Sequence, residues 1–197
     1  NFSPTIGFMF PDALVRLSSG SAYCSGALLA PDTVLTCNHF FRNHPDGVTV
    51  RQGTKIRTIR TVAPVAGTDI AVVRIRPFRH LEGADFPELG ETPSVGDPTV
   101  TLGYGGRAKR LQSRDGFWVV PLPVAVSRAG SLVRPAGIVF NRTPALKGAS
   151  GGPVLAGGKV AGVQSLIVDP FGLNSHFAVV NLLPEALRRE LADGLRT

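Results

Sequence analysis

The chain has 197 residues, of which 43% are hydrophobic and 18% charged, so it can bury a substantial core and is not an intrinsically disordered polypeptide. Its formal net charge of +7 comes mainly from arginines that are spread along the sequence. We interpret them as the solvent-facing sides of strands, and because no aromatic residues interleave with them we expect no nucleic-acid partner. No apolar run approaches the length of about 18 residues that a membrane-spanning helix needs.

The first half of the chain, residues 1–85, is predicted to form one β-barrel domain. Short runs of β-branched and other apolar residues are separated by turn-forming residues, and the whole sequence holds 23 glycines and 16 prolines. This pattern is typical of all-β barrels with frequent turns. The expected strands lie near residues 12–18, 22–30, 33–38, 48–51, 55–63 and 70–76.

The second half, residues 86–197, is predicted to form a second β-barrel followed by a short C-terminal helix. The segment 79–97, rich in glycine, proline and acidic residues, would connect the two barrels. Leu183, Leu187 and Leu191 have helical spacing, and Gly194 is a typical helix end. The expected strands lie near residues 98–103, 117–126, 137–141, 153–156, 159–168 and 175–180.

A glycine-rich loop before a predicted strand, Gly148–Pro153, carries the strongest chemical signal. Acyl transfer needs a nucleophile and two backbone N–H groups aimed at a developing oxyanion, and Ser150 and Gly148 would supply them. The two glycines after Ser150 carry no side chain that would hinder a substrate carbonyl. The simpler interpretation, a glycine-rich hairpin, accounts for the loop when it is taken alone.

Two further residues complete a possible catalytic set. The β-rich run Thr33–Cys37 leads to His39, and Asp69 directly precedes the apolar run Ile70–Ile75. Singly, each is ordinary, because a histidine after a strand is usually a surface residue and an aspartate before one is usually a turn residue. Together with Ser150 they follow one of the known chain orders of the Ser-His-Asp triad, in which the histidine comes first.

The chain resembles the chymotrypsin-like (trypsin-like) serine proteases along most of its length. The family patterns Cys-Gly-Gly-Ser-Leu-Ile, Val-Leu-Thr-Ala-Ala-His, Asp-Ile-Ala-Leu-Leu-Lys-Leu, Gly-Trp-Gly and Gly-Val-Val-Ser-Trp have counterparts in the same order. The matching segments are 24–29 (CSGALL), 34–39 (VLTCNH), 69–75 (DIAVVRI), 103–105 (GYG) and 162–166 (GVQSL).

This resemblance implies an all-β fold of two six-stranded antiparallel Greek-key barrels with a short C-terminal helix. It implies a serine endopeptidase in which Ser150 is the nucleophile, His39 the general base and Asp69 the residue that orients His39. Gly148 and Ser150 would supply the oxyanion hole. Its substrate would be a protein or peptide, and we expect a monomer without cofactor or metal, because the four histidines and two cysteines show no ligand spacing.

One departure from the family concerns the residue before the nucleophile. Digestive members have an aspartate there, which binds a newly cleaved N-terminus, whereas this chain has Ala149. The oxyanion loop is therefore expected to be held by packing or local hydrogen bonds. The spacings of 30 residues from His39 to Asp69 and 81 from Asp69 to Ser150 favour the compact bacterial or secreted glutamyl-endopeptidase-like branch, and so a secreted or extracytoplasmic location.

The resemblance also assigns the walls of the primary specificity pocket. Pro144 occupies the floor position where trypsin has an aspartate, so cleavage after lysine or arginine is not expected. Gln164 replaces the histidine of glutamyl endopeptidases, which argues against that specificity, and Ile167 narrows the entrance. We expect a small or medium uncharged residue before the scissile bond, and leave open whether Ser175 or His176 points into the pocket. The predicted substrate-binding residues are Pro144, Ala145, Gln164, Ser165, Leu166, Ile167, Ser175 and His176.

The two cysteines allow two interpretations. Cys24 and Cys37 lie on strands predicted to pair, and the hairpin register could set them opposite each other, which would give a disulfide in a secreted protein. Alternatively, they are two small buried hydrophobic residues.

A different class of function also fits the composition. An inactive relative of the fold could bind anionic partners, such as cell-surface or wall components, through its basic surface. The complete set of His39, Asp69 and Ser150 argues against this alternative.

Overall fold

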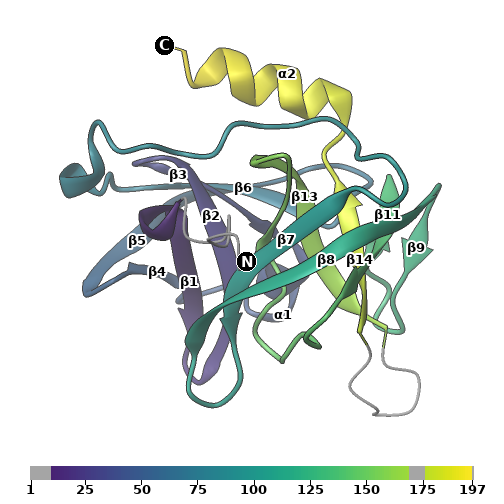
Figure 1. The fold of residues 1–197 in the computed structure, drawn as a ribbon. Helices are drawn as coiled ribbons and strands as arrows, with labels where there is room; N and C mark the ends of the chain where they lie inside the picture. Colours follow the sequence, from purple (N-terminus) through teal and green to yellow (C-terminus); the bar gives the residue numbers. More distant parts are fainter. Residues whose placement is uncertain (1–9, 169–175, 197) are drawn as a thin grey trace, which may run out of the picture.

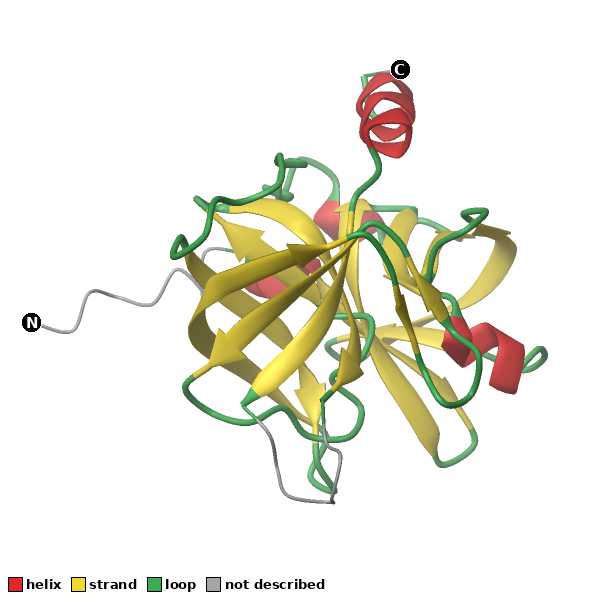
Figure 2. Ribbon diagram, turned by 90° about the vertical axis from the view of Figure 1, so that its right-hand side faces the viewer, coloured by secondary structure: helices red, strands yellow, loops and turns green. Residues whose placement is uncertain are grey.

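Two closed antiparallel barrels of six strands each make up the computed structural model, which describes residues 10–168 and 176–196 (Figure 1). The expected all-β, double-barrel architecture is confirmed. Strands form both halves of the molecule, and helices are short and peripheral (Figure 2). Within the described residues, no helix is long and apolar enough to cross a membrane.

The first barrel is formed by six strands in the order β1-β2-β3-β6-β5-β4, and pairing of β4 with β1 closes it. A short helix, α1 (His39–Asn43), follows β3, where no helix was expected from the sequence. The strands are β1 (Leu14–Ser19), β2 (Ala22–Ala30), β3 (Thr33–Cys37), β4 (Thr49–Gln52), β5 (Lys55–Pro64) and β6 (Ile70–Ile75).

The second barrel has the order β11-β14-β13-β12-β7-β8, and a separate hairpin of β9 (Ala125–Val126) and β10 (Leu132–Val133) precedes β11. Strand β8 begins seven residues before the expected position, because residues 110–116 pair with β7 although most of them are polar. The barrel strands are β7 (Pro98–Gly105), β8 (Arg110–Leu122), β11 (Ala136–Asn141), β12 (Pro153–Ala156), β13 (Lys159–Ile167) and β14 (Phe177–Leu182).

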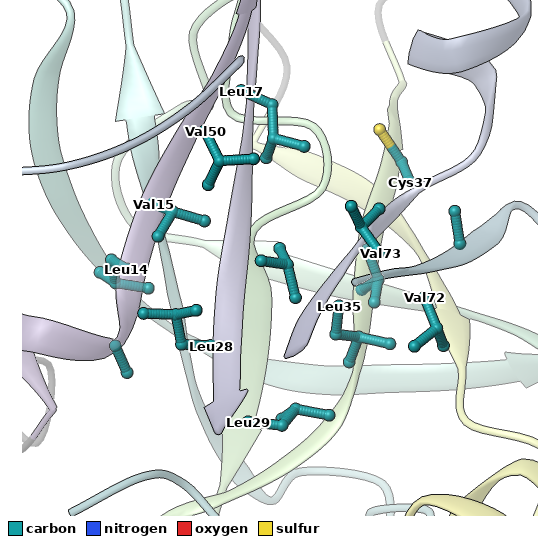
Figure 3. Packing of buried hydrophobic residues seen from close by; sticks show 14 of the residues in the cluster. Leu14, Val15, Leu17, Leu28, Leu29, Leu35, Cys37, Val50, Val72 and Val73 are labelled. Carbon is teal, nitrogen blue, oxygen red and sulfur yellow. The ribbon is translucent and has the colours of Figure 1, made fainter. Parts of the chain in front are cut away.

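One hydrophobic cluster extends from the first barrel into the second and fixes how they dock. In the first barrel it contains side chains such as Val15 and Leu35 (Figure 3). In the second barrel the same cluster includes Leu102 and Leu155. The C-terminal helix α2 (Glu185–Gly194), expected over nearly the same residues, adds its apolar face to this cluster through Leu187 and Leu191. Each buried leucine contributes about 1.5–3 kcal/mol, so helix and barrels stabilise one another.

The second barrel has its own interior around the fully buried Trp118 on β8. Its ring fills the space above Gly137 on β11, where an added Cβ would collide with the indole. We expect Trp118→Ala to lower the free energy of unfolding by about 3–5 kcal/mol, because it leaves a large cavity. Urea unfolding followed by far-UV circular dichroism measures this loss. Phe117→Ala is the control, since Phe117 is 42% exposed, and an equal loss in both variants would contradict the packing described.

Candidate active site

Pairing of β3 with β6 brings His39 beside Asp69. Cys37, the last residue of β3, lies opposite Ile70, the first residue of β6. The next residues along each strand therefore meet, and the N–H of Asn38 donates to the carbonyl of Asp69 at 2.9 Å. His39 then begins α1, which turns the chain away from the barrel. The two residues singled out in the sequence are thus neighbours because of the strand register.

The Asp69 carboxylate is buried and accepts three hydrogen bonds. Its side chain is only 2% exposed, and Nδ1 of His39 lies 2.7 Å from Oδ2. The backbone N–H of His39 donates to Oδ1 at 2.8 Å, and the hydroxyl of Ser165 on β13 donates to Oδ2. These donors compensate the carboxylate for lost hydration. They also fix the ring orientation of His39.

The electrostatic surroundings of His39 favour its protonated form. Burial lowers the pKa of His39, but the hydrogen bond to Asp69, with a smaller contribution from Cys37, outweighs burial and raises the pKa from 6.5 to about 10. The Nδ1–H is thereby directed to the carboxylate, which leaves Nε2 as the atom that can exchange a proton with another group.

Ser150 lies between the barrels, in the loop that precedes β12 (Pro153–Ala156). Its backbone carbonyl accepts a hydrogen bond from the N–H of Ser25 on β2 at 2.8 Å. Its hydroxyl donates to the carbonyl of Ser165 at 3.3 Å, and among the described residues no hydrogen bond joins it to His39. Ser150 and His39 line the same cleft. A rotation about the Cα–Cβ bond of Ser150 would be needed to turn the hydroxyl from Ser165 toward His39.

In the loop around Ser150, two backbone N–H groups are hydrogen-bonded and two have no acceptor among the described residues. The N–H groups of Ala149 and Gly151 are bonded to the carbonyls of Leu146 and Gln164. In the described part of the chain, by contrast, no acceptor is assigned to the N–H of Gly148 or of Ser150. Gly148 has a φ of +100°, which strongly favours glycine, and a Cβ there would collide with the ring of Tyr23. Two free donors on one loop are what a developing oxyanion requires.

Two residues of the first barrel hold this loop, and the sequence pattern did not single them out for that role. Ser25 donates its hydroxyl to the carbonyl of Gly148 at 2.9 Å and accepts the N–H of Tyr104 at 2.8 Å. Tyr23 packs its ring against Gly148, while its hydroxyl lies 3.1 Å from the carbonyl of Lys147. Ala149 itself is buried. Packing and local hydrogen bonds therefore hold the loop in the described structure.

The residues predicted to bind substrate lie around β13 and the loop before Ser150. Gln164 and Ser165 are buried, whereas Leu166 and Ile167, toward the end of β13, are half-buried. Ala145 is buried, and Pro144 beside it is half-buried. The side-chain amide of Gln164 has no partner among the described residues.

The sequence left open whether Ser175 or His176, just before β14, points into the predicted pocket, and the structure describes only His176. The Nδ1 atom of His176 lies 2.7 Å from the carbonyl of Asn141, and its ring stacks on Phe140 with centroids 5.4 Å apart. Its described contacts are therefore with β11. Ser175 lies outside the described residues.

A buried arginine beneath the predicted pocket floor was missed by sequence reasoning. Arg114 on β8 is only 1% exposed, and its Nε donates to the carbonyl of Pro144 at 3.1 Å. Its Nη2 donates to Gln112, and its Nη1 has no partner among the described residues. Nothing in the run of polar residues from 110 to 116 marks this one as buried. The residue predicted to form the pocket floor, Pro144, thus has a buried guanidinium bonded to its carbonyl.

The possible disulfide is absent from the structure, in which Cys24 and Cys37 are both buried free thiols. The β2–β3 register pairs Gly26 with Thr36, so the two cysteines are offset by one residue instead of lying opposite each other. Contact with Cys24 and burial raise the pKa of Cys37 well above 9.0, and its sulfur lies 3.9 Å from Nε2 of His39.

In the described ranges, no three His, Cys, Asp or Glu side chains form a group that could hold a metal.

A protein-family model and a known protein match the part of the chain that contains the site. The family model of the trypsin-like peptidase domain matches residues 24–163, which contain His39, Asp69 and Ser150. A putative Do-like protease 3 of Arabidopsis thaliana mitochondria is 28% identical over 141 residues, 71% of this chain and 24% of that protein. The chain thus spans about a quarter of that relative's length.

Two solved structures have the same fold. Kallikrein-related peptidase 10 superposes with a TM-score of 0.75 at 19% identity, covering 98% of this chain and 99% of the other. The Rv3671c protease of M. tuberculosis, in its active form, superposes with a TM-score of 0.70 at 18% identity, covering 97% and 82%. At these identities the likeness establishes the double-barrel fold.

The hydrogen bond between His39 and Asp69 predicts an unusual titration. Because Asp69 raises the pKa of His39, the imidazole should stay protonated as the pH rises past 6.5, and replacing the carboxylate should lower the midpoint. Histidine NMR of the wild type and of Asp69→Asn measures both midpoints. Asp46→Asn, which removes an exposed carboxylate, is the control. Equal midpoints in wild type and Asp69→Asn would show that Asp69 does not set the charge of His39.

Proposed function

The chain belongs to the trypsin-like peptidase domain family, a family of serine peptidases, and we propose that it is an endopeptidase that works through an acyl-enzyme on Ser150. The observation that carries the proposal is the fixed orientation of the His39 ring. Its Nδ1 is held by buried Asp69, while the rest of the ring and Ser150 share one cleft. That arrangement provides a base beside a nucleophile, with a third group that orients the base.

The reaction would proceed in two halves. The reaction needs His39 in its neutral form, which the raised pKa makes the minor form at neutral pH. The Ser150 hydroxyl turns toward this neutral His39, gives its proton to Nε2 and attacks the substrate carbonyl carbon, and the N–H groups of Gly148 and Ser150 bind the resulting oxyanion. His39 then protonates the leaving amine as the peptide bond breaks. In the second half, water gives a proton to Nε2 of His39 and attacks the acyl carbon, and His39 returns that proton to the Ser150 oxygen as the ester bond breaks and the acid product leaves. Asp69 stabilises the imidazolium in both halves.

The preference for the residue before the scissile bond follows from the pocket floor. The guanidinium of Arg114 lies directly behind Pro144, so a lysine or arginine entering the pocket would meet a like charge at low dielectric. Ile167 on β13 adds bulk beside the pocket. We therefore propose cleavage after small or medium uncharged residues.

Covalent labelling tests the nucleophile. A fluorophosphonate probe should label the wild type, and Ser150→Ala should lose the label because no other serine is activated by His39. In triads of this type, loss of the serine lowers turnover by about a millionfold. Ser94→Ala, which removes an exposed serine hydroxyl, should label normally, and circular dichroism checks that each variant is folded. Labelling of Ser150→Ala at the wild-type level would refute the assignment. A wild type that never labels would favour the inactive, anion-binding alternative.

A peptide series that varies only the residue before the scissile bond tests the pocket. We expect kcat/KM to be at least about tenfold higher for alanine, valine or leucine than for lysine or arginine. Mass spectrometry of the products confirms the position of cleavage. A strong preference for lysine or arginine would show that the residues around Pro144 do not form the pocket.

A further inference from the structure

A cleft of about 930 Å³ opens beside Ser150 and His39. Its walls come from the β1–β2 hairpin, from α1, from the tip of the β7–β8 hairpin and from residues 146–148. No residue of β13 or β14 lines it, although the hydroxyl of Ser150 bonds to the Ser165 carbonyl on β13. The cleft and β13 therefore lie on different sides of the nucleophile.

These positions define which part of a substrate would enter the cleft. The predicted specificity pocket and β13 take the residues before the scissile bond. The chain must then leave Ser150 on its other side, past His39, which protonates the departing amine. The cleft is consequently the place for the first residues after the scissile bond.

Three lysine and arginine side chains line this cleft, and none of them has a carboxylate partner among the described residues. Arg107 and Lys109 stand at the tip of the β7–β8 hairpin, and Lys147 directly precedes Gly148. The lining contains no aspartate or glutamate. Within residues 10–168 and 176–196, none of the three side chains forms an ion pair. The cleft therefore has a concentrated positive potential directed at bound substrate.

The basic wall is also held in a defined place. The hydroxyl of Tyr23 lies 2.5 Å from the carbonyl of Gly106, and the N–H of Gly106 donates to the carbonyl of Lys147 at 3.0 Å. The ammonium of Lys109 lies 5.4 Å from the centre of the Tyr23 ring, within range of a cation–π interaction. Lys109 adopts a φ of +51°, a left-handed conformation that this hairpin tip imposes on it. The hairpin tip that carries Arg107 and Lys109 is thus fixed in place by contacts with Tyr23 and Lys147.

We propose that this cleft selects substrates with aspartate or glutamate among the first three residues after the scissile bond. The inference rests on the proposed endopeptidase function, and it adds a substrate class to it. An acidic side chain there would pair with Arg107, Lys109 or Lys147, which have no carboxylate partner in the described part of the chain. Because the cleft is open to solvent, the preference should be modest and should weaken as salt is added.

Cleavage of matched peptides is the first test. The peptides share one sequence before the scissile bond and carry Glu-Glu, Gln-Gln or Lys-Lys at the second and third positions after it. At low salt we expect kcat/KM to fall in that order, by about five- to tenfold between Glu-Glu and Gln-Gln, and the differences to shrink in 1 M NaCl. Arg107→Glu/Lys109→Glu should reverse the order, and Arg107→Gln/Lys109→Gln, which leaves only Lys147, should shrink the differences to less than half.

Arg60→Glu is the matched control, because it changes the net charge at an exposed position on β5 outside the cleft. It should keep the wild-type order of peptides. An active enzyme with equal kcat/KM for the three peptides, or the same change in order with Arg60→Glu, would overturn the inference and leave the proposed function intact.

A binding measurement on Ser150→Ala separates the two proposals, since it needs no turnover. Fluorescein-labelled peptides that begin with Ala-Glu-Glu, Ala-Gln-Gln or Ala-Lys-Lys represent the leaving segment, and anisotropy gives their Kd. The acidic peptide should bind about five- to tenfold more tightly than the neutral one and lose most of this advantage in Arg107→Gln/Lys109→Gln, which retains Lys147. Equal affinities would overturn the inference. Acid-selective binding without any cleavage by the wild type would refute the endopeptidase and retain the selective cleft.

Discussion

The buried carboxylate of Asp69 is the constraint on which the rest of the site depends. A charge that is almost wholly removed from water must be compensated by hydrogen bonds, and its donors come from both barrels. His39 lies on the first barrel and Ser165 on the second. The amide N–H of Asp69 also donates to the side chain of Asn181 on β14 at 2.9 Å. The Asp69 charge can therefore stay buried only when the two barrels are docked and the ring of His39 is oriented toward it.

The loop that carries Ser150, Gly148–Pro153, is also held by hydrogen bonds from the other barrel, and in this case the bonded groups are uncharged. Ser25 contacts it twice, through its N–H to Ser150 and through its hydroxyl to the carbonyl of Gly148. Because both contacts originate on β2, the loop conformation follows from how the first barrel presents one serine. The glycine at 148 permits the required backbone angle, and the ring of Tyr23 occupies the space that a side chain would need.

Much of this architecture could be predicted from the sequence, because its signals are local. The short strands, the C-terminal helix and the positions of His39 and Asp69 at strand ends follow from short runs of apolar residues and from spacing. The arrangement in two six-stranded barrels follows from the resemblance to the chymotrypsin-like proteases. The early start of β8 could not be predicted in this way. Residues 110–116 are mostly polar, and only their pairing with β7 makes them a strand.

Features that depend on contacts between distant residues were missed for the same reason. Arg114 resembles any surface arginine until the fold places Pro144 over it, and Ser25 resembles an ordinary strand residue until the second barrel docks. The offset of Cys24 and Cys37 depends on a register that differs by one residue from the pairing that the sequence allowed. Strand positions can be inferred from composition, but registers and docking need the three-dimensional structure.

The contacts between β2 and the nucleophile loop have a consequence for the order in which the protein matures. Synthesis delivers the first barrel, with His39 and Asp69, long before Ser150, and Asn181 later still. Since the carboxylate of Asp69 and the loop that carries Ser150 are both held by groups from opposite barrels, neither half contains the complete site. The set of hydrogen bonds around Asp69 is therefore complete only after β14, which carries Asn181, has been synthesised and has joined the second barrel.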